Sequence, residues 1–558
     1  MKARRIVAKK VGGGARPAAW TLHVVGGLIV ALISAGGCCG QPANAQTTDK
    51  PLIVRVTADR PDALYLNGET AAFTIEVTRG GRRADGGEVE VWIAQDGSPG
   101  KIEKKKFALS ADAPVRVSGS VDEPAFLLCQ AWASVGSAKA YGEKMVWYRG
   151  AADTTKTSVE LVTDREDALY RCGKPATFSA RVTKDGQRLT EGYLEFALAG
   201  EIRGQPTTRQ VLDLAGDRPL TISGTLDEPG FLYCQARVLK SPDERLPSYR
   251  WDTFTSVGFD VEKLRPQSVL PEDFEAFWLE TLGKAEELPM DVKLEKIEKA
   301  CNARADYYRF SIATLNGERV YGFLGIPRGK GPFPAIALYP GHGAGWTMPG
   351  DIGLTPRGVI TLMMNVHKYP VAGSSAEAQK QMKDYAAKHN VSNYSSAGSS
   401  SRETHHFHTI LAGFSRAVDY LRSRDDWDGE HLLVSGTSQG GFLTLATAGL
   451  CAGRVTAAMA GVPGFCDFNR NHRTDDTALL NTMTYYDAAN FARFIRCPVR
   501  VSVGFLDGSC PAPGVLSAYN AIPSTDKRII MGPRGGHTIT PLRQAAEREW
   551  ILQALGLQ

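Results

Sequence analysis

The chain contains no Cys-x-x-Cys pair, and no histidine occurs from Gln46 through Gly341. Without paired cysteines nothing supports a zinc-ribbon site. Without histidine, this segment lacks the side chain most often used as a general base near neutral pH. The glycine-rich stretch ALYPGHGAGW is not followed by Gly-Lys-Ser or Gly-Lys-Thr, which excludes a phosphate-binding loop there. In the mature chain, histidine-dependent chemistry is therefore expected only after residue 341.

The first 45 residues have the composition of an export signal. They carry six basic and no acidic side chains, contain the apolar stretch VVGGLIVALISA, and end in Ala43-Asn44-Ala45, a small-residue cleavage pattern. We predict that residues 1–45 are removed, with the mature protein periplasmic or extracellular and without stable membrane insertion. A lipid anchor at Cys38 is the weaker alternative.

The leader also explains why the chain is basic overall. Six of the 65 basic residues lie in it, which leaves 59 basic against 60 acidic residues in the mature part. A nearly neutral balance gives no electrostatic support for a nucleic-acid partner. We therefore predict that the protein does not bind nucleic acid.

An internal repeat with an offset of 105 residues occupies the region after the leader. ADRPDALYLNGETAAFTIEVTRGGR recurs as TDREDALYRCGKPATFSARVTKDGQ, and SGSVDEPAFLLCQA recurs as SGTLDEPGFLYCQA. Apolar and polar residues alternate between turn signals, which indicates half-buried antiparallel strands. We predict two immunoglobulin-like β-sandwiches, over residues 50–152 and 155–262. Cys129 and Cys234 occupy equivalent strand positions and are expected in the two cores.

From residue 265 to residue 558 the pattern changes to an α/β domain. PEDFEAFWLETLGKA has helical spacing, and the apolar runs that follow are separated by helical stretches, which favours a mostly parallel sheet covered by helices. The patch VSNYSSAGSSSRE is expected to be a surface insertion. The predicted strands cover residues 308–313, 321–326, 335–338, 359–365, 432–434, 456–460, 499–504 and 528–531.

One short stretch of this domain carries a nucleophile pattern. HLLVSGTSQGGFLTLA has Gly436-Thr437-Ser438-Gln439-Gly440 at its centre, which fits G-x-S-x-G. The motif lies between an apolar run suited to a strand and a small-residue helical run, which is the context of a nucleophile elbow. We therefore predict Ser438 as the nucleophile, with glycines at 436 and 440 because the turn leaves no room for Cβ atoms.

An acid and a histidine follow in the order that an α/β-hydrolase requires. Asp507 comes directly after the apolar run VRVSVGFL, and His537 follows the next run and a glycine-rich loop. His537 would take the proton of the Ser438 hydroxyl, and Asp507 would hold the imidazole tautomer. For the oxyanion hole we predict the backbone N–H groups of Gln439 and Ala344, the latter in the loop PGHGAGW.

The residue pattern of a second histidine group does not favour a metal site. His405, His406 and His408 open an apparent helix rich in core residues, with Glu403 as the only nearby carboxylate and no cysteine at ligand spacing. We therefore expect these three histidines to have roles in the core or at the surface. The sequence predicts neither a metal nor a cofactor.

From about residue 268 the chain resembles the acetyl xylan esterase / cephalosporin-C deacetylase family of α/β-hydrolases. The residues that carry the resemblance are PEDFEAFW, HGAG, WDGEHLLVSGTSQGGF, NFARFIRCPVRVSVGFLDGSCPAP with AYN after it, and GGHT. The resemblance implies a metal-independent serine esterase that releases acetate from sugar hydroxyls, often as an oligomer. The chain differs from the family pattern in lacking Arg-Gly-Gln before the elbow, where it reads NVHKYPVAGSS, and in having Thr538 after the histidine instead of Glu.

These observations predict an exported serine esterase with two sandwich domains before an α/β-hydrolase domain. It would remove acetyl or other small acyl groups from an acylated oligo- or polysaccharide through an acyl-enzyme intermediate, and it is a possible homo-oligomer. One alternative is a peptidase resembling prolyl oligopeptidase, although two repeats are too few for a propeller. Another is a non-catalytic protein whose sandwiches bind glycan.

Overall fold

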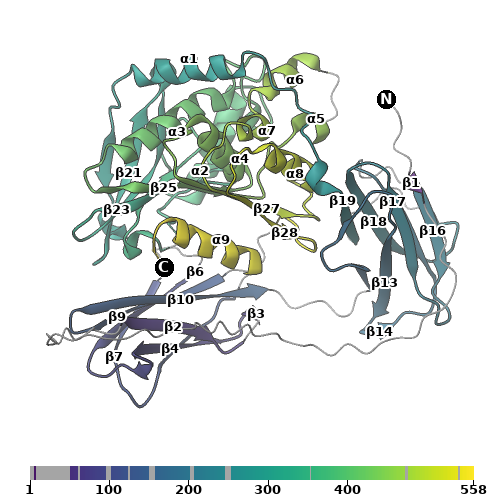
Figure 1. The fold of residues 1–558 in the computed structure, drawn as a ribbon, viewed down its shortest axis with the longest axis horizontal. Coiled ribbons are helices and arrows are strands. Elements are labelled where there is room, and N and C mark those ends of the chain that lie inside the picture. The colour runs from purple at the N-terminus through teal and green to yellow at the C-terminus, as the bar shows by residue number, and fades with distance from the viewer. Residues whose placement is uncertain are drawn as a thin grey trace, which may run out of the picture.

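The computed structural model describes residues 6–7, 51–60, 63–95, 102–122, 126–149, 157–201, 207–244, 253–351, 353–471, 476–537 and 541–557. Apart from residues 6–7, the predicted export signal, including Cys38, lies outside this range, and so does Thr538. In the described part of the chain, no helix is long and apolar enough to cross a membrane. Three parts are visible in Figure 1: a large helix-covered sheet and two smaller groups of strands.

The large sheet has nine strands in the order β20-β21-β22-β24-β23-β25-β26-β27-β28. The first three pairings, β20-β21, β21-β22 and β22-β24, are antiparallel, whereas the five from β24-β23 to β27-β28 are parallel. All eight predicted strands are present. The strands are β20 (Lys293–Lys296), β21 (Ala305–Ala313), β22 (Arg319–Pro327), β23 (Phe333–Tyr339), β24 (Ile360–Met364), β25 (Trp427–Thr437), β26 (Ala457–Gly461), β27 (Val499–Gly504) and β28 (Lys527–Gly532).

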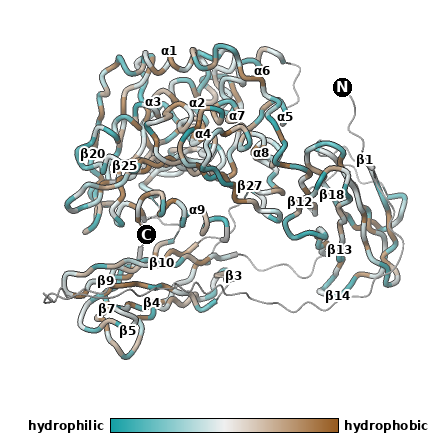
Figure 2. Tube along the Cα trace, in the orientation of Figure 1, coloured by the Kyte–Doolittle hydropathy of each residue, from teal (hydrophilic) through white to brown (hydrophobic). Residues whose placement is uncertain are grey.

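Helices cover both faces of this sheet because its central strands are largely hydrophobic along their length, as the trace in Figure 2 shows. Every residue of β24, β26 and β27 is buried. In Figure 1, α9 lies on the opposite side of the sheet from α1, α3 and α4. The helices are α1 (Phe274–Glu286), α2 (Ser375–Lys388), α3 (His406–Arg422), α4 (Gln439–Leu450), α5 (Phe468–Asn471), α6 (Thr477–Thr484), α7 (Ala488–Ala492), α8 (Ala512–Ala521) and α9 (Pro541–Ala554), with 3-10 turns η1 (Val261–Lys263), η2 (Glu298–Ala300), η3 (Leu315–Gly317), η4 (Thr355–Arg357) and η5 (Tyr394–Ser396).

The first repeat forms a sandwich of two sheets, called sandwich 1 below. One sheet has the order β2-β4-β5 with β8 on β4, and the other has the order β3-β10-β9-β6-β7. Cys129 is fully buried in the core between them, as predicted. The strands are β2 (Leu52–Ala58), β3 (Leu64–Leu66), β4 (Ala71–Arg79), β5 (Arg82–Arg83), β6 (Glu88–Gln95), β7 (Ile102–Ala108), β8 (Val115–Gly119), β9 (Phe126–Val135) and β10 (Ala138–Arg149).

The second repeat, sandwich 2, has the same plan. Its sheets have the orders β17-β13-β11, with β14 on β13, and β12-β19-β18-β15-β16; the short strand β1, which belongs to residues 1–45 and not to the repeat, pairs with β17. Cys234 is fully buried in its core, which confirms the second core cysteine. The strands are β1 (Ile6–Val7), β11 (Ser158–Thr163), β12 (Leu169–Tyr170), β13 (Ala176–Lys184), β14 (Gln187–Arg188), β15 (Tyr193–Ala199), β16 (Thr208–Asp213), β17 (Thr221–Leu226), β18 (Gly230–Leu239) and β19 (Phe254–Phe259).

Sandwich 1 packs against the α9 side of the hydrolase domain (Figure 1). The guanidinium of Arg548 on α9 donates to the carboxylate of Glu143 on β10, with one contact of 2.6 Å. Arg357 lies over the ring of Tyr141 at 4.0 Å, and Gln130 donates to the carbonyl oxygen of Gly353 at 3.3 Å. Buried polar contacts of this kind fix the orientation of the two domains.

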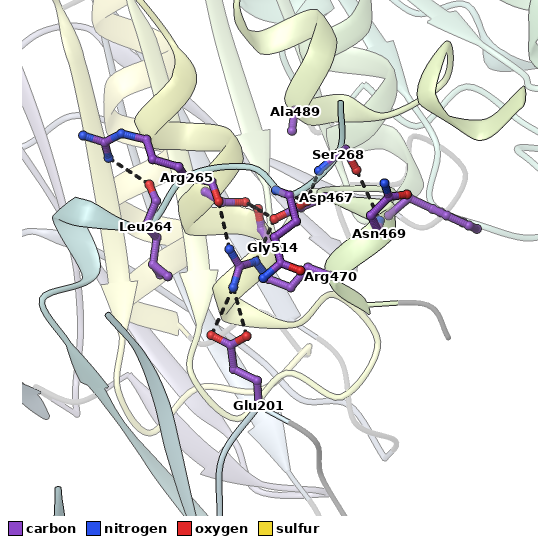
Figure 3. A network of polar contacts seen from close by, with 12 residues as sticks. Glu201, Leu264, Arg265, Ser268, Asp467, Asn469, Arg470, Ala489 and Gly514 are labelled. Atoms are coloured by element: carbon purple, nitrogen blue, oxygen red, sulfur yellow. Dashed lines mark hydrogen bonds and ion pairs between the residues drawn. The ribbon is translucent and has the colours of Figure 1, made fainter. Parts of the chain in front are cut away.

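Sandwich 2 is anchored through a buried arginine, shown in Figure 3. Arg470 donates to Glu201 of sandwich 2 at 2.9 Å and, on its other side, to Asp467 at 2.7 Å. Asp467 also accepts from the backbone N–H groups of Gln267 and Ser268, which belong to the segment that leads from sandwich 2 into the hydrolase domain. One guanidinium therefore joins both domains and their connection.

Candidate active site

The strand β25 runs into Ser438, and α4 begins at the next residue. Ser438 has φ 64° and ψ −121°, a left-handed backbone that costs energy for a residue with a Cβ. A Cβ added to Gly436 would lie 2.6 Å from the carbonyl oxygen of Tyr339, and one on Gly440 would lie 2.4 Å from the same atom. Both glycines are therefore required by close backbone approach, as the sequence predicted, and the turn lifts the serine side chain out of the strand.

Asp507 and His537 meet just beyond the ends of β27 and β28. Asp507 is fully buried, and its Oδ1 accepts the backbone N–H groups of Ser509 and Cys510, each at 2.8 Å. His537 Nδ1 lies 2.9 Å from Oδ2 and 3.1 Å from Oδ1 of the same carboxylate. Because an ionised carboxylate only accepts hydrogen bonds, Nδ1 carries the proton in this contact and Nε2 of the neutral ring keeps its lone pair.

Two backbone hydrogen bonds hold the loops of this acid and this histidine together. Leu506 N–H donates to the carbonyl of Gly535 at 2.9 Å, and Phe505 N–H donates to that of Gly532 at 3.0 Å. A Cβ on Gly504 would lie only 2.5 Å from the carbonyl oxygen of Gly536. The glycines before His537 thus allow the two loops to approach closely.

Cys510 links Ser438 to this pair. Its Sγ, a ligand atom of Asp507 and a ring nitrogen of His537 all lie within 4.8 Å of one another. Burial raises the pKa of the Cys510 thiol to about 12, and a hydrogen bond with Ser438 acts in the opposite direction. The thiol is therefore protonated at neutral pH, and the serine, the histidine and the aspartate are gathered around it. The sequence patterns assigned no role to Cys510.

The loop after β23 passes next to Ser438. At Gly341 a Cβ would lie 4.0 Å from the Cβ of Ser438. Further along the loop, the backbone N–H groups of His342 and Ala344 have no hydrogen-bond partner within the described residues, so both are available to a ligand. Gln439, the other predicted donor, is the first residue of α4, where backbone N–H groups point out of the helix. The structure adds His342 to the candidates for the loop donor.

The serine-rich patch that was expected on the surface is mostly exposed or half-buried, but Tyr394, Ser395 and Ala397 within it are buried. Tyr394 in η5 is 1% exposed, and its hydroxyl donates to the Oε1 of Gln439 at 2.9 Å. The Tyr394 ring also stacks on His342 with ring centroids 4.9 Å apart. The polar composition of the patch concealed this contact, because a single aromatic side chain carries it.

The histidine cluster lies in the core of the domain. His405, His406 and His408 are 1%, 1% and 9% exposed. Their nitrogens have separate uses: His406 Nε2 lies 2.8 Å from the carbonyl of Val366, and His408 Nε2 lies 3.1 Å from the hydroxyl of Thr281. Among the described residues, the set of metal-ligand types that does converge is Asp507, Cys510 and His537.

Two hollows border the region. A cavity of about 250 Å³ is lined by Gly341, Trp346 and Thr437 and by Met145 of sandwich 1. A more open cleft of about 590 Å³ lies between the Arg165–Leu169 turn of sandwich 2 and Pro533, which precedes His537. Each sandwich thus lines a hollow together with hydrolase-domain residues that lie close in the sequence to Ser438 or His537.

Strand order, elbow and the positions of Asp507 and His537 together define an α/β-hydrolase fold with two β-sandwich domains before it. A profile of the acetyl xylan esterase family matches residues 259–478 and 469–554, which together make up more than half of the chain. The chain belongs to this family, and it is a carboxylic ester hydrolase.

A relative found by sequence agrees with this assignment. The acetyl esterase Axe7A of Xylanibacter ruminicola is 31% identical over 364 residues, which cover 62% of this chain and 79% of the relative. Among solved structures, an acetyl xylan esterase from Paenibacillus sp. R4 is similar with a TM-score of 0.46 and 21% identity, over 52% of this chain and 98% of that one. An acetyl xylan esterase of a Thermoanaerobacterium species has a TM-score of 0.46 and 20% identity, over 53% and 97%.

Proposed function

We propose that the protein is an exported serine esterase that removes acetyl or other small acyl groups from carbohydrate hydroxyls. The observation that carries the proposal is the contact of His537 Nδ1 with the buried carboxylate of Asp507, in the neighbourhood of a serine at a strained elbow. The family and the named activity of its relatives support an acylated oligo- or polysaccharide as substrate. They favour ester over peptide hydrolysis.

In the proposed reaction, Ser438 Oγ attacks the carbonyl carbon of the ester while its proton moves to His537 Nε2. Asp507 stabilises the imidazolium that forms. The negative charge on the former carbonyl oxygen is held by the N–H of Gln439 at the start of α4 and by a loop N–H, that of Ala344 or His342.

Collapse of this tetrahedral intermediate breaks the bond to the sugar oxygen, which leaves as an alcohol with the proton from His537. The acyl group remains on Ser438 as an ester. Water then attacks this ester with His537 as general base, and a second collapse releases acetate and restores the serine. No metal or cofactor enters these steps.

The composition of residues 1–45 supports export to the periplasm or beyond the cell. Mass spectrometry of the protein from its native host tests this part, with a mature N-terminus near Gln46 expected. A lipid-modified Cys38 at the N-terminus would replace secretion by membrane anchoring.

The reaction is tested with purified protein on p-nitrophenyl acetate and on acetylated polysaccharides, scored by released acid. Ser438→Ala should lower turnover by several orders of magnitude, as removal of a triad serine commonly does. Ser423→Ala is the matched control, because it removes the same hydroxyl group from an exposed serine at the end of α3, where that hydroxyl donates to the carbonyl of Tyr420. Full activity of Ser438→Ala would refute the mechanism.

A further inference from the structure

The loop that passes Ser438 is fixed through both polar groups of one residue. The backbone N–H of Gly343 lies 3.4 Å from the hydroxyl oxygen of Tyr394, and its carbonyl oxygen lies 2.9 Å from Nε2 of His367. Gly343 has φ 145°, a conformation that L-residues rarely adopt. Both polar groups of Gly343 are occupied, whereas the backbone N–H groups of its neighbours His342 and Ala344 have no partner in the described part of the chain and remain for a ligand.

The contact between the Gly343 carbonyl and His367 also fixes the direction in which the N–H of Ala344 points. A carbonyl oxygen can only accept, so His367 Nε2 carries the proton. The peptide between Gly343 and Ala344 is planar and trans, so the N–H of Ala344 points away from the carbonyl that His367 holds. A hydrogen bond on one side of this peptide therefore determines where its donor points on the other side.

The His367 ring is itself held rigidly. It is 1% exposed, stacks on Tyr369 with centroids 4.8 Å apart, and meets the Tyr394 ring edge-on at 4.7 Å. Burial lowers the pKa of His367 to about 4, with the hydrogen bond to Gly343 acting in the opposite direction. The ring is thus neutral at pH 7, and its Nδ1 has no hydrogen-bond partner in the described part of the chain.

Tyr394 connects the loop to the other proposed donor. Its hydroxyl accepts from Gly343 and donates to the Oε1 of Gln439 at 2.9 Å. A neighbouring residue reinforces the arrangement, because Asn365 binds both the N–H and the carbonyl of Trp346 at 2.8 and 3.0 Å. Asn365 and His367 both lie in NVHKYPVAGSS, the segment that replaces the Arg-Gly-Gln of the family pattern.

We propose that His367 is a positioning residue that orients the oxyanion loop, and that Tyr394 couples this loop to Gln439. The inference rests on the proposed function, because it assumes a tetrahedral intermediate on Ser438. His367 does not touch the substrate in this scheme. It acts through the Gly343–Ala344 peptide.

The test compares His367→Phe, which keeps a ring but has no donor, with His367→Gln, which keeps an N–H, on p-nitrophenyl acetate. We expect His367→Phe to lower kcat about 10- to 100-fold with KM within about twofold. A correctly directed donor stabilises the transition state more than the bound ester, so its misdirection mainly raises the barrier of the chemical step. His367→Gln should recover a large part of this loss. Tyr369→Phe is the matched control, since it keeps the stacked ring and should leave kcat within about twofold.

Inhibition by an alkyl trifluoromethyl ketone, which forms a tetrahedral adduct with serine, gives a second readout. Its inhibition constant should rise in His367→Phe by about the same factor as kcat/KM falls. Equal losses in the Phe and Gln variants, or a Phe variant with unchanged kcat, would overturn the proposal. If His367→Phe fails to fold, Tyr394→Phe tests the proposal in its place. A fall in kcat of Tyr394→Phe would support the proposal, and an unchanged kcat would refute it. Failure of the proposed function itself is distinct, because Ser438→Ala would then remain active.

Discussion

The hydroxyl of Ser256 in sandwich 2 donates to the backbone carbonyl of Phe505, 2.8 Å away and two residues before Asp507. Ser256 is fully buried, and next to it the ring of Phe231 packs edge-on against that of Phe505, with centroids 5.1 Å apart. The loop that carries the candidate acid is therefore supported from outside the hydrolase domain. This relationship makes sandwich 2 part of the framework of the site.

The first prediction concerns this support. Ser256→Ala leaves a buried carbonyl without its donor, which should cost about 1–3 kcal/mol of stability and lower kcat about two- to tenfold as the Asp507 loop relaxes. Ser223→Ala is the control, because it removes a 3.0 Å contact with Thr177 within the same sandwich. Thermal unfolding and ester turnover of both variants check this. Equal turnover in the two variants would mean that the contact only stabilises the fold.

The second prediction concerns the carboxylate itself. Asp507→Asn keeps the shape of the side chain but would favour the wrong tautomer of His537, and we expect kcat to fall about 10⁴-fold. Asp526→Asn serves as the control, since Asp526 is half exposed and pairs with Arg500 at 2.8 Å. Its turnover should stay within about twofold. Comparable activity of Asp507→Asn and the wild type would assign the acid elsewhere.

The third prediction concerns the docking of sandwich 2. Arg470→Ala leaves Glu201 and the fully buried Asp467 without their shared cation, which should destabilise the protein by about 3–5 kcal/mol. Calorimetry and limited proteolysis between sandwich 2 and the hydrolase domain check this. For comparison, Arg188→Ala removes an exposed pair with Asp217 and should change stability by less than about 1 kcal/mol. Similar melting curves for the two variants would contradict a structural role of the anchor.

The fourth prediction concerns acid stability. Burial lowers the pKa of His367 and of His408 to about 4 and that of His405 to about 3, and it lowers the pKa of His406 as well. These rings stay neutral in the folded state but take up protons near pH 6.5 when the domain unfolds. Stability from this source is complete above about pH 6.5 and is lost as the pH falls toward about 4.

Unfolding at pH 5 should accordingly be coupled to the uptake of about four protons, one for each ring. Denaturant unfolding followed between pH 5 and pH 7 measures this slope. A slope near zero would show that the four rings are protonated in the folded state.

Local sequence patterns were sufficient to predict the strands, and to predict those side chains whose roles depend on their order along the chain. The eight strands, the two repeats and the elbow could be predicted because each follows from apolar periodicity or from glycines at fixed spacing. The meeting of Asp507 and His537 could be anticipated for a related reason. Parallel strands deliver their carboxyl ends to one edge of the sheet, so residues just beyond those ends come together.

The rest was decided by contacts between segments that no local pattern connects. The predicted surface patch places Tyr394 against Gln439. The segment NVHKYPVAGSS holds the loop beside Ser438 through His367. Neither segment has a periodicity from which these contacts could be predicted. Likewise, nothing in the repeats indicates that Ser256 meets Phe505. Chain order specified which groups could react, whereas packing of distant segments decided what holds those groups in place, because a hydrogen bond depends on distance in space and not along the chain.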